Sequence, residues 1–271
     1  MHGVYLKALL GYYRRLAAEH RLDVLCLQEN VPLASCAEPA EARTQAHLVG
    51  QTLESFQCLC QPDHPGLATL VSPAWQVEES FLVPLPRLER LSWVERMYIA
   101  GGVVKQKYAL VSVLRKGPHA LTVVNFHLDT AGDNAHRRRQ VAAIAGALST
   151  RGIARHVVAC GDTNAFTWSR TRNGSVLVEL MEPLCSAAGA KLCTELSATH
   201  FFARQREPLL THRLLTWIGK LGIDHPLAYD VICSDLELVR SGQVVTTESD
   251  HDLVYAKLSW PSASAIRHSS G

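Results

Sequence analysis

The residues HVVACGDTN, at positions 156–164, decide the fold because they join an apolar run to a polar turn. Val157–Cys160 is short, continuous and apolar, and Gly161–Asn164 follows it directly. Apolar runs of this length that end in turn-forming residues are typical of strands inside a sheet. We therefore expect a strand that carries Asp162 and Asn164 to one edge of a sheet.

Four other apolar runs also have ionisable side chains at one end. Glu29 and His127 each follow such a run, whereas Asp230 and the segment Ser249–Asp252 each precede one. The ends of some strands and the starts of others meet at one edge of a mixed or antiparallel sheet. We therefore expect a single rim to hold the following residues: Glu29, His127, Asp162, Asn164, Asp230, Asp250 and His251.

The residue types at this rim indicate a particular chemistry. Carboxylates gathered at one place repel each other, and their pKa values rise unless a cation is present. Carboxylate oxygens are the ligands that Mg²⁺ and Mn²⁺ prefer. Histidine and asparagine side chains beside such an ion can donate hydrogen bonds to an anionic transition state. Together these groups predict metal-assisted attack of water on a phosphate ester.

Helices and strands alternate along the chain. Apolar residues recur at helical spacing in four segments, 6–17, 41–55, 135–148 and 175–187. Strands are expected at 23–27, 108–114, 121–126, 156–160, 229–233 and 253–258, and the proline-rich residues 61–90 predict loops around short strands such as 67–71. A hairpin turn is expected at 116–118. Because no linker interrupts the alternation, we expect one α/β domain over residues 1–271, with a frayed tail at 261–271.

The composition excludes several classes of protein. The chain has 271 residues, of which 47% are apolar and 19% charged, so it is not generally disordered. No apolar run approaches the roughly 18 residues that a membrane helix needs. The net charge of +2 excludes nucleic-acid binding by bulk electrostatics alone. No signal peptide is evident, so we expect a cytoplasmic protein with reduced thiols. Cys58 and Cys60 have no second pair at zinc spacing, and cysteine spacing therefore predicts no structural zinc site.

The five motifs, in this order, resemble the endonuclease/exonuclease/phosphatase superfamily. That superfamily contains DNase I-like nucleases, abasic endonucleases, tyrosyl-DNA phosphodiesterases and neutral sphingomyelinases. The resemblance spans residues 23–258 and depends on the order of the motifs, because no single motif is specific. It implies an α/β fold in which a two-sheet β-sandwich is flanked by helices, giving four layers.

The resemblance also implies a role for each rim residue. Glu29 and Asp250 would bind the metal, Mg²⁺ or Mn²⁺, and Asp162 would orient or deprotonate the attacking water. His127, Asn164 and His251 would contact the phosphate. Asp230 would pair with the catalytic histidine. Family members usually begin with a strand that carries a metal-contacting asparagine, and this first strand is expected to be missing, either because the sequence starts late or because the protein has lost it.

Arginine and tryptophan residues near the motifs have two readings. Trp168, Arg170 and Arg172 follow the Gly161–Asn164 turn and either bind the substrate or belong to a packed loop. The arginines at 137–139 are expected to form a mainly solvated helix face, and Arg137 with Gln140 to have a structural role.

The substrate is the least specific part of the prediction. We expect a monomer that hydrolyses a phosphodiester in nucleic acid, because most of the branches that the motifs resemble use it. The alternatives are a lipid or small-molecule phosphoester, as in sphingomyelinase-like or inositol-phosphatase-like relatives, and a catalytically silent family member that binds a phosphorylated partner.

Overall fold

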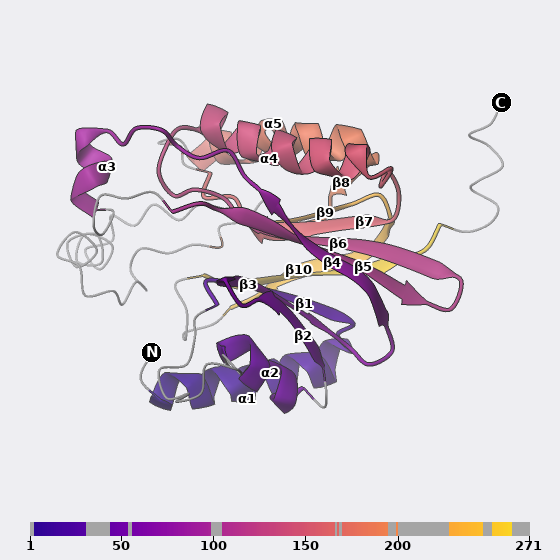
Figure 1. Cartoon of the computed structure of the whole chain (residues 1–271). Helices are drawn as coiled ribbons and strands as arrows, with labels where there is room; N and C mark the ends of the chain where they lie inside the picture. Colours follow the sequence, from indigo (N-terminus) through magenta and orange to yellow (C-terminus); the bar gives the residue numbers. More distant parts are fainter. Residues whose placement is uncertain are drawn as a thin grey trace, which may run out of the picture.

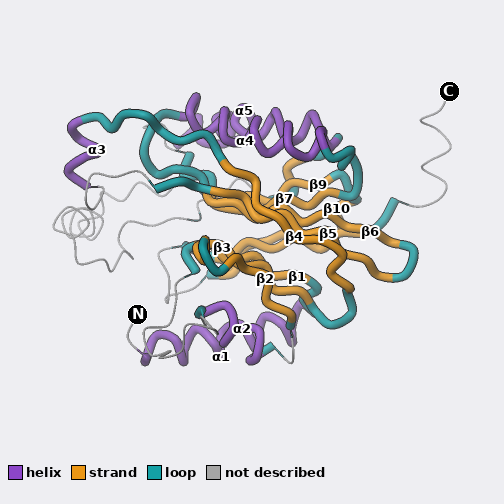
Figure 2. Tube along the Cα trace, in the orientation of Figure 1, coloured by secondary structure: helices purple, strands orange, loops and turns teal. Residues whose placement is uncertain are grey.

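Two β-sheets pack face to face between two pairs of helices in this computed structural model (Figure 1). The structure describes residues 3–30, 44–53, 56–98, 105–165, 167, 170–194, 199, 228–245 and 251–261. Figure 2 shows helices α4 and α5 outside one sheet and helices α1 and α2 outside the other. This arrangement confirms the expected α/β fold with a helix-flanked sandwich. Among the described residues, no helix is long and apolar enough to cross a membrane.

The larger sheet has the strand order β4-β5-β6-β7-β9-β8. Its strands are β4 (Gln76–Pro84), β5 (Tyr108–Lys116), β6 (His119–His127), β7 (Val157–Asp162), β8 (Lys191–Leu192) and β9 (Asp230–Ser234). Strands β6 and β7 are parallel, and the other neighbours are antiparallel. Helices α4 (Asn134–Thr150) and α5 (Arg170–Ala188) cover its outer face through a core that includes Phe126, Ile144 and Leu177. The short helix α3 (Trp93–Tyr98) lies apart from both layers (Figure 1).

The smaller sheet has the order β1-β3-β2 and is antiparallel throughout. Its strands are β1 (Val24–Gln28), β2 (Gln57–Gln61) and β3 (His64–Val71), covered by helices α1 (Gly3–His20) and α2 (Gln45–Thr52). The hairpin of β10 (Glu237–Val244) and β11 (Leu253–Ser259) forms a separate two-stranded antiparallel sheet. The Tyr12 hydroxyl of α1 donates to the Val244 carbonyl at 3.3 Å, and this contact ties the hairpin to α1.

The side chain of Asn125 connects the two sheets through hydrogen bonds. It is fully buried on β6, and its Nδ2 donates to the carbonyl oxygens of Leu27 and Ala68 at 3.2 and 2.9 Å. Its Oδ1 accepts from Nε2 of Gln28 at 2.7 Å. Most of the surrounding inter-sheet layer is apolar, with Leu114 and Val123 at its centre. The polar contacts of Asn125 therefore fix how β1 and β3 sit on β6.

The predicted strands are confirmed, and three other expectations need correction. The helix expected at 41–55 is shorter, because Thr44 has extended backbone angles and the helix begins after it. Residues 61–90 are not mainly loop: β3 and the edge strand β4 occupy much of them, and exposed Glu78 and Glu79 hide the strand pattern of β4. Helix α5 begins at Arg170 rather than near 175. Most of the tail, 262–271, lies outside the described residues, and the missing first strand stays a prediction.

We predict that Asn125→Leu lowers the free energy of unfolding by about 2–4 kcal/mol. Leucine has a similar volume, but it leaves two buried carbonyl groups and the Gln28 amide without their partner. Gln28→Met is the graded control, because it removes only one of these bonds and should cost about 1 kcal/mol. Urea unfolding measures both values. Equal stability of Asn125→Leu and the unmodified chain would contradict this role.

Candidate active site

Three neighbouring strands place His127, Asp162 and Asp230 in one row across the larger sheet. His127 is the register partner of Asp162 on the parallel strand β7, and Asp162 is the partner of Asp230 on the antiparallel strand β9. The ends of β6 and β7 and the start of β9 therefore meet at one edge. This is the convergence that the sequence predicted for these three residues.

The Asp162 carboxylate lies between two imidazole rings. Its Oδ2 is 3.7 Å from Nε2 of His127 and 3.9 Å from Nε2 of His251. Its Oδ1 accepts a hydrogen bond of 2.7 Å from the backbone N–H of Asn164, which closes an Asx turn. Asn164 has a left-handed backbone, with φ +48°, and its Nδ2 donates to the Leu128 carbonyl at 3.1 Å. The turn thus holds the carboxylate and the amide beside the end of β6.

Asp230 and His251 form a hydrogen-bonded pair. Nδ1 of His251 lies 2.9 Å from Oδ2 of Asp230. A proton on Nδ1 is shared with the carboxylate, so the Nε2 side of the ring faces Asp162. The buried Thr199 supports the pair from both sides: its Oγ1 accepts from the backbone N–H of Asp230 at 3.2 Å, and its carbonyl accepts from that of Asp252 at 2.8 Å. No motif marks Thr199 in the sequence, and its contribution depends on this tertiary contact.

Burial and neighbouring charges shift the pKa values of the two central groups. Burial raises the pKa of Asp162 to about 7, and the negative charges of Asp230 and Glu29 add to this effect against the opposing influence of His251. Burial also holds the pKa of His127 well below its usual value, assisted by the positive charges of Lys107 and His251. His127 is therefore neutral at neutral pH, and Asp162 is poised to exchange a proton there.

Lys107 is a site residue that the sequence motifs did not include. Burial lowers the pKa of its amine, whereas the negative charges of Asp129, Asp162 and Glu29 oppose that shift. Lys107 immediately precedes β5, whose first residues pair antiparallel with the last residues of β6. The signal that could have found it is this position at the start of a strand next to the strand that ends in His127.

Glu29 comes to the rim from the other sheet. It directly follows β1, is exposed, and has a left-handed backbone with φ +55°. Its charge acts on both Asp162 and Lys107, which places it electrostatically within the same site. Asp250, the other predicted metal ligand, lies outside the described residues.

The donor set at the rim fits a hard divalent cation. Ligand atoms of Asp162, Asp230 and His251 all lie within 4.8 Å of one another. The carboxylates of Asp162 and Asp230, with Glu29 acting on the same site, concentrate negative charge where burial makes that charge costly. A divalent cation would offset this repulsion, and oxygen donors suit Mg²⁺ or Mn²⁺.

A buried network braces the loop that follows His127. Oδ2 of Asp129 contacts Nε2 of His136 at 2.8 Å and accepts from Nε2 of Gln140 at 2.9 Å. The Arg137 guanidinium, only 2% exposed, donates to the carbonyl oxygens of Asp129 and Thr130 at 2.9 and 2.6 Å. Arg138 and Arg139 are exposed, as expected for a mainly solvated face, whereas Arg137 is the buried member and its donors satisfy loop carbonyls. The structural role expected for Arg137 and Gln140 agrees with these contacts.

The predicted substrate-binding residues are only partly described. Trp168 lies outside the described residues, and Arg170 is the first residue of α5. Arg172 is exposed on the first turn of the same helix. A role for Trp168, Arg170 and Arg172 in substrate binding stays a prediction.

No family model matches the chain, and no curated protein is significantly similar to it in sequence. Solved structures nevertheless share its fold over most of both chains. An endonuclease/exonuclease/phosphatase from Bacteroides vulgatus is 17% identical, with a TM-score of 0.62 over 93% of this chain and 90% of that one. TDP2 of D. rerio, complexed with single strand DNA product, is 13% identical, with a TM-score of 0.58 over 93% and 90%. The mannosyl-6-phosphatase Bt3783 of Bacteroides thetaiotaomicron VPI-5482 is 12% identical, with a TM-score of 0.60 over 94% and 92%.

These likenesses confirm the fold that the order of the motifs predicted. The chain has the fold of endonuclease/exonuclease/phosphatase proteins, which is DNase I-like. Sequence identities of 11–17% carry the comparison no further than the fold.

We predict that Asp162→Asn stabilises the metal-free protein, and does so more strongly as the pH rises. Because the pKa of Asp162 is raised to about 7 in the folded chain, its favourable contribution is full below its usual value of 3.8 and is lost as the pH rises through about 7. Asparagine does not ionise. The difference in unfolding free energy between variant and unmodified chain should therefore grow from about pH 4 to about pH 7, by at most roughly 1.4 kcal/mol per pH unit, and level off above that.

The measurement is urea unfolding in EDTA at several pH values. Asp63→Asn, in the exposed turn between β2 and β3, is the matched control and should show no such trend. A difference that stays constant with pH would show that burial does not raise the pKa of Asp162.

Proposed function

We propose that the protein hydrolyses phosphodiester bonds with the help of a divalent metal ion, Mg²⁺ or Mn²⁺. The observation that carries this proposal is the position of the Asp162 carboxylate, 3.7 and 3.9 Å from two imidazole nitrogens. One of those imidazoles is itself held by a second carboxylate, Asp230, at 2.9 Å. A base flanked by two groups that can bind a phosphoryl oxygen is suited to the attack of water on phosphorus.

Glu29 and Asp250 would hold the metal in this proposal. The charge of Glu29 already acts on Asp162, and a cation between these acids would relieve their repulsion. When bound, a divalent ion supplies Lewis-acid polarisation of the phosphate and neutralises charge on the leaving oxygen. The shared fold and the rim carboxylates support this assignment, and Asp250 enters it through the resemblance of the Ser249–His251 motif.

Asp162 acts as the general base. Its oxygen accepts a proton from the attacking water while the water oxygen forms a bond to phosphorus and the bond from phosphorus to the leaving oxygen breaks. Burial raises the pKa of Asp162 to about 7 in the metal-free protein, and a bound cation would lower it, which leaves the carboxylate ionised and able to accept a proton at neutral pH. The hydrogen bond from the Asn164 backbone keeps the carboxylate in place during this step.

The remaining polar groups stabilise the negative charge that develops on the phosphoryl oxygens. His251, oriented by Asp230, presents its Nε2 toward the reacting group. His127 is neutral and can donate a single hydrogen bond, and the Asn164 amide can donate another. Lys107 adds a partly buried amine to the same site. These groups act where water is largely excluded, so each interaction is stronger than it would be in solution.

Nucleic acid is the substrate that we propose, acted on by a monomer. D. rerio TDP2, which shares the fold, was solved complexed with single strand DNA product. The net charge of +2 favours a short single-stranded segment over a broad duplex-binding surface. The alternative is a small phosphoester, because the mannosyl-6-phosphatase Bt3783 also shares this fold.

We predict that Asp162→Asn and His251→Ala each lower kcat for phosphodiester hydrolysis by about 10²–10⁴-fold. The first removes the base, and the second removes the imidazole that faces the reacting group. His119→Ala is the matched control, since His119 is exposed at the opposite end of β6 from His127. Circular dichroism checks that each variant is folded. Full activity in either folded site variant would overturn the mechanism.

We predict that the protein cleaves labelled single-stranded oligonucleotides in Mg²⁺ and that EDTA abolishes the cleavage. Sphingomyelin and inositol phosphates, assayed in parallel, should be turned over slowly or not at all. Faster turnover of sphingomyelin would establish the lipid alternative, and faster turnover of inositol phosphates the small-molecule alternative. If no substrate is turned over and calorimetry detects no Mg²⁺ binding, the chain is a catalytically silent member with this fold.

A further inference from the structure

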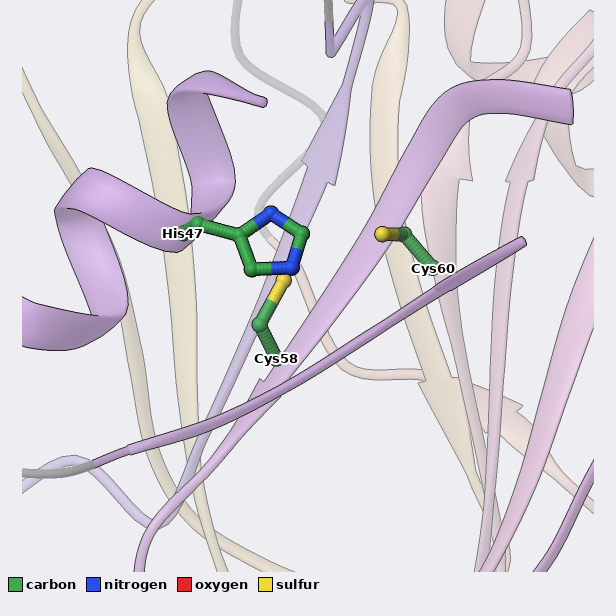
Figure 3. Close-up of side chains that lie close together, drawn as sticks. All are labelled: His47, Cys58 and Cys60. Atoms are coloured by element: carbon green, nitrogen blue, oxygen red, sulfur yellow. The ribbon is translucent and has the colours of Figure 1, made fainter. Parts of the chain in front are cut away.

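One histidine and two cysteines converge on the outer side of the smaller sheet. His47 lies on helix α2, and Cys58 and Cys60 lie on strand β2, two residues apart and therefore on the same face. Their ligand atoms, a ring nitrogen and two sulfurs, all lie within 4.8 Å of one another. Figure 3 shows the imidazole of His47 and the thiol of Cys58 directed toward each other, with the thiol of Cys60 beside them. All three residues are half-buried.

Thr44, the residue that precedes α2, orients the members of this cluster. Its Oγ1 lies 3.0 Å from Nδ1 of His47, and it also forms a hydrogen bond with Cys60. A histidine that binds a metal through one ring nitrogen usually donates the proton of the other nitrogen to an oxygen. In the metal-free protein Nδ1 of His47 instead accepts from the backbone N–H of Thr44 at 3.2 Å, with the Thr44 hydroxyl beside it, so this nitrogen is held at the start of α2. The ring is therefore held in an orientation that leaves its other nitrogen for a ligand.

The donor types in this cluster select a class of ligand. Two thiolates and an imidazole are soft or borderline donors, which favour Zn²⁺ over Mg²⁺ and Ca²⁺. Zn²⁺ takes four ligands, and sites with three protein ligands leave the fourth position to water or to an incoming group. A surface pocket of about 340 Å³, lined by His47, Gly50, Gln51, Phe56 and Cys58, lies next to the cluster and gives room for that group.

We propose that His47, Cys58 and Cys60 bind Zn²⁺ at a second metal site, distinct in position and chemistry from the carboxylate rim. Cysteine spacing alone predicts no such site, because the third ligand comes from a helix that the sequence places before β2. The fold supplies His47 by packing α2 on the sheet that contains β2, where Val49 and Leu70 share one core cluster.

The two thiols also interact with each other. Their sulfur atoms lie within 4.8 Å of each other. A metal ion replaces the thiol protons with a direct bond to sulfur, so its binding releases protons.

Zinc at this site would fasten helix α2 to an edge strand. β2 has a sheet neighbour, β3, on one side in the order β1-β3-β2. The start of α2 is also tied to the loop after β1, because Oδ1 of Asn30 accepts from the backbone N–H of Ala46 at 3.0 Å. Binding should therefore raise the melting temperature, since a ligand that binds only the folded chain stabilises it.

Cobalt substitution tests the site directly. The chain is purified under reducing conditions, stripped of metal and titrated with Co²⁺, whose bonds to thiolate sulfur give a charge-transfer absorption band. We expect the unmodified protein to show this band and Zn²⁺, but not Mg²⁺, to remove it. Cys58→Ser and Cys60→Ser should each lose at least about half of the band's intensity, because each leaves one of the two thiolates. His47→Ala should weaken Zn²⁺ binding at least about tenfold, as even the loss of an outer partner does.

Two control variants separate this site from other thiols and from the rim. Cys26→Ser changes a half-buried cysteine outside the cluster, and Asp162→Asn changes the rim, so both should keep the band. Zn²⁺ should raise the melting temperature of both controls but not of Cys60→Ser. Absence of the band in the unmodified protein, or its persistence at full intensity in Cys60→Ser, would overturn the proposal. Neither result depends on hydrolytic activity, so the two proposals fail independently.

Discussion

The buried amide of Asn125 fixes the relation between the two sheets on which the candidate active site depends. Its contacts to Leu27, Gln28 and Ala68 join β6 to β1 and β3. Glu29 directly follows Gln28 along the chain, and His127 lies two residues beyond Asn125 on the same face of β6. A buried amide without partners is costly, so only one placement of the sheets satisfies it. The same bonds therefore set how Glu29 approaches the residues of the larger sheet.

Burying ionisable side chains at the rim costs folding free energy. Burial disfavours the charged forms of Asp162 and Lys107. It therefore raises the pKa of Asp162 and lowers the pKa of Lys107. A chain selected for stability alone would avoid such a cluster. The surrounding contacts offset the cost: the Asx turn holds the carboxylate, and Arg137 satisfies the loop carbonyls that follow His127. Polar groups that are held rigidly in place can stabilise charge that develops in a transition state without having to reorganise.

A site residue could be predicted from the sequence where its position follows from the residues next to it along the chain. Strand ends are local, so the meeting of His127, Asp162, Asp230 and His251 could be predicted from apolar runs and the residues beside them. Thr199 could not, because its role arises from tertiary contact, and Lys107 carried only the signal of its place at the start of β5, next to the strand that ends in His127. The structural role of Arg137 was expected from its spacing to Gln140, but the depth of its burial beside exposed Arg138 and Arg139 depends on the packing of α4.

The two proposed metal sites differ in a way that lets one chain keep two kinds of cation apart. Carboxylate oxygens at the rim suit Mg²⁺, but an oxygen and nitrogen site of this kind also binds Zn²⁺ more tightly than it binds Mn²⁺. Charge alone would therefore not keep Zn²⁺ from the rim. The sulfur donors of Cys58 and Cys60 add a preference that the rim lacks, so scarce Zn²⁺ distributes toward the cluster with His47. The discrimination follows from donor type, and it requires no contact between the sites.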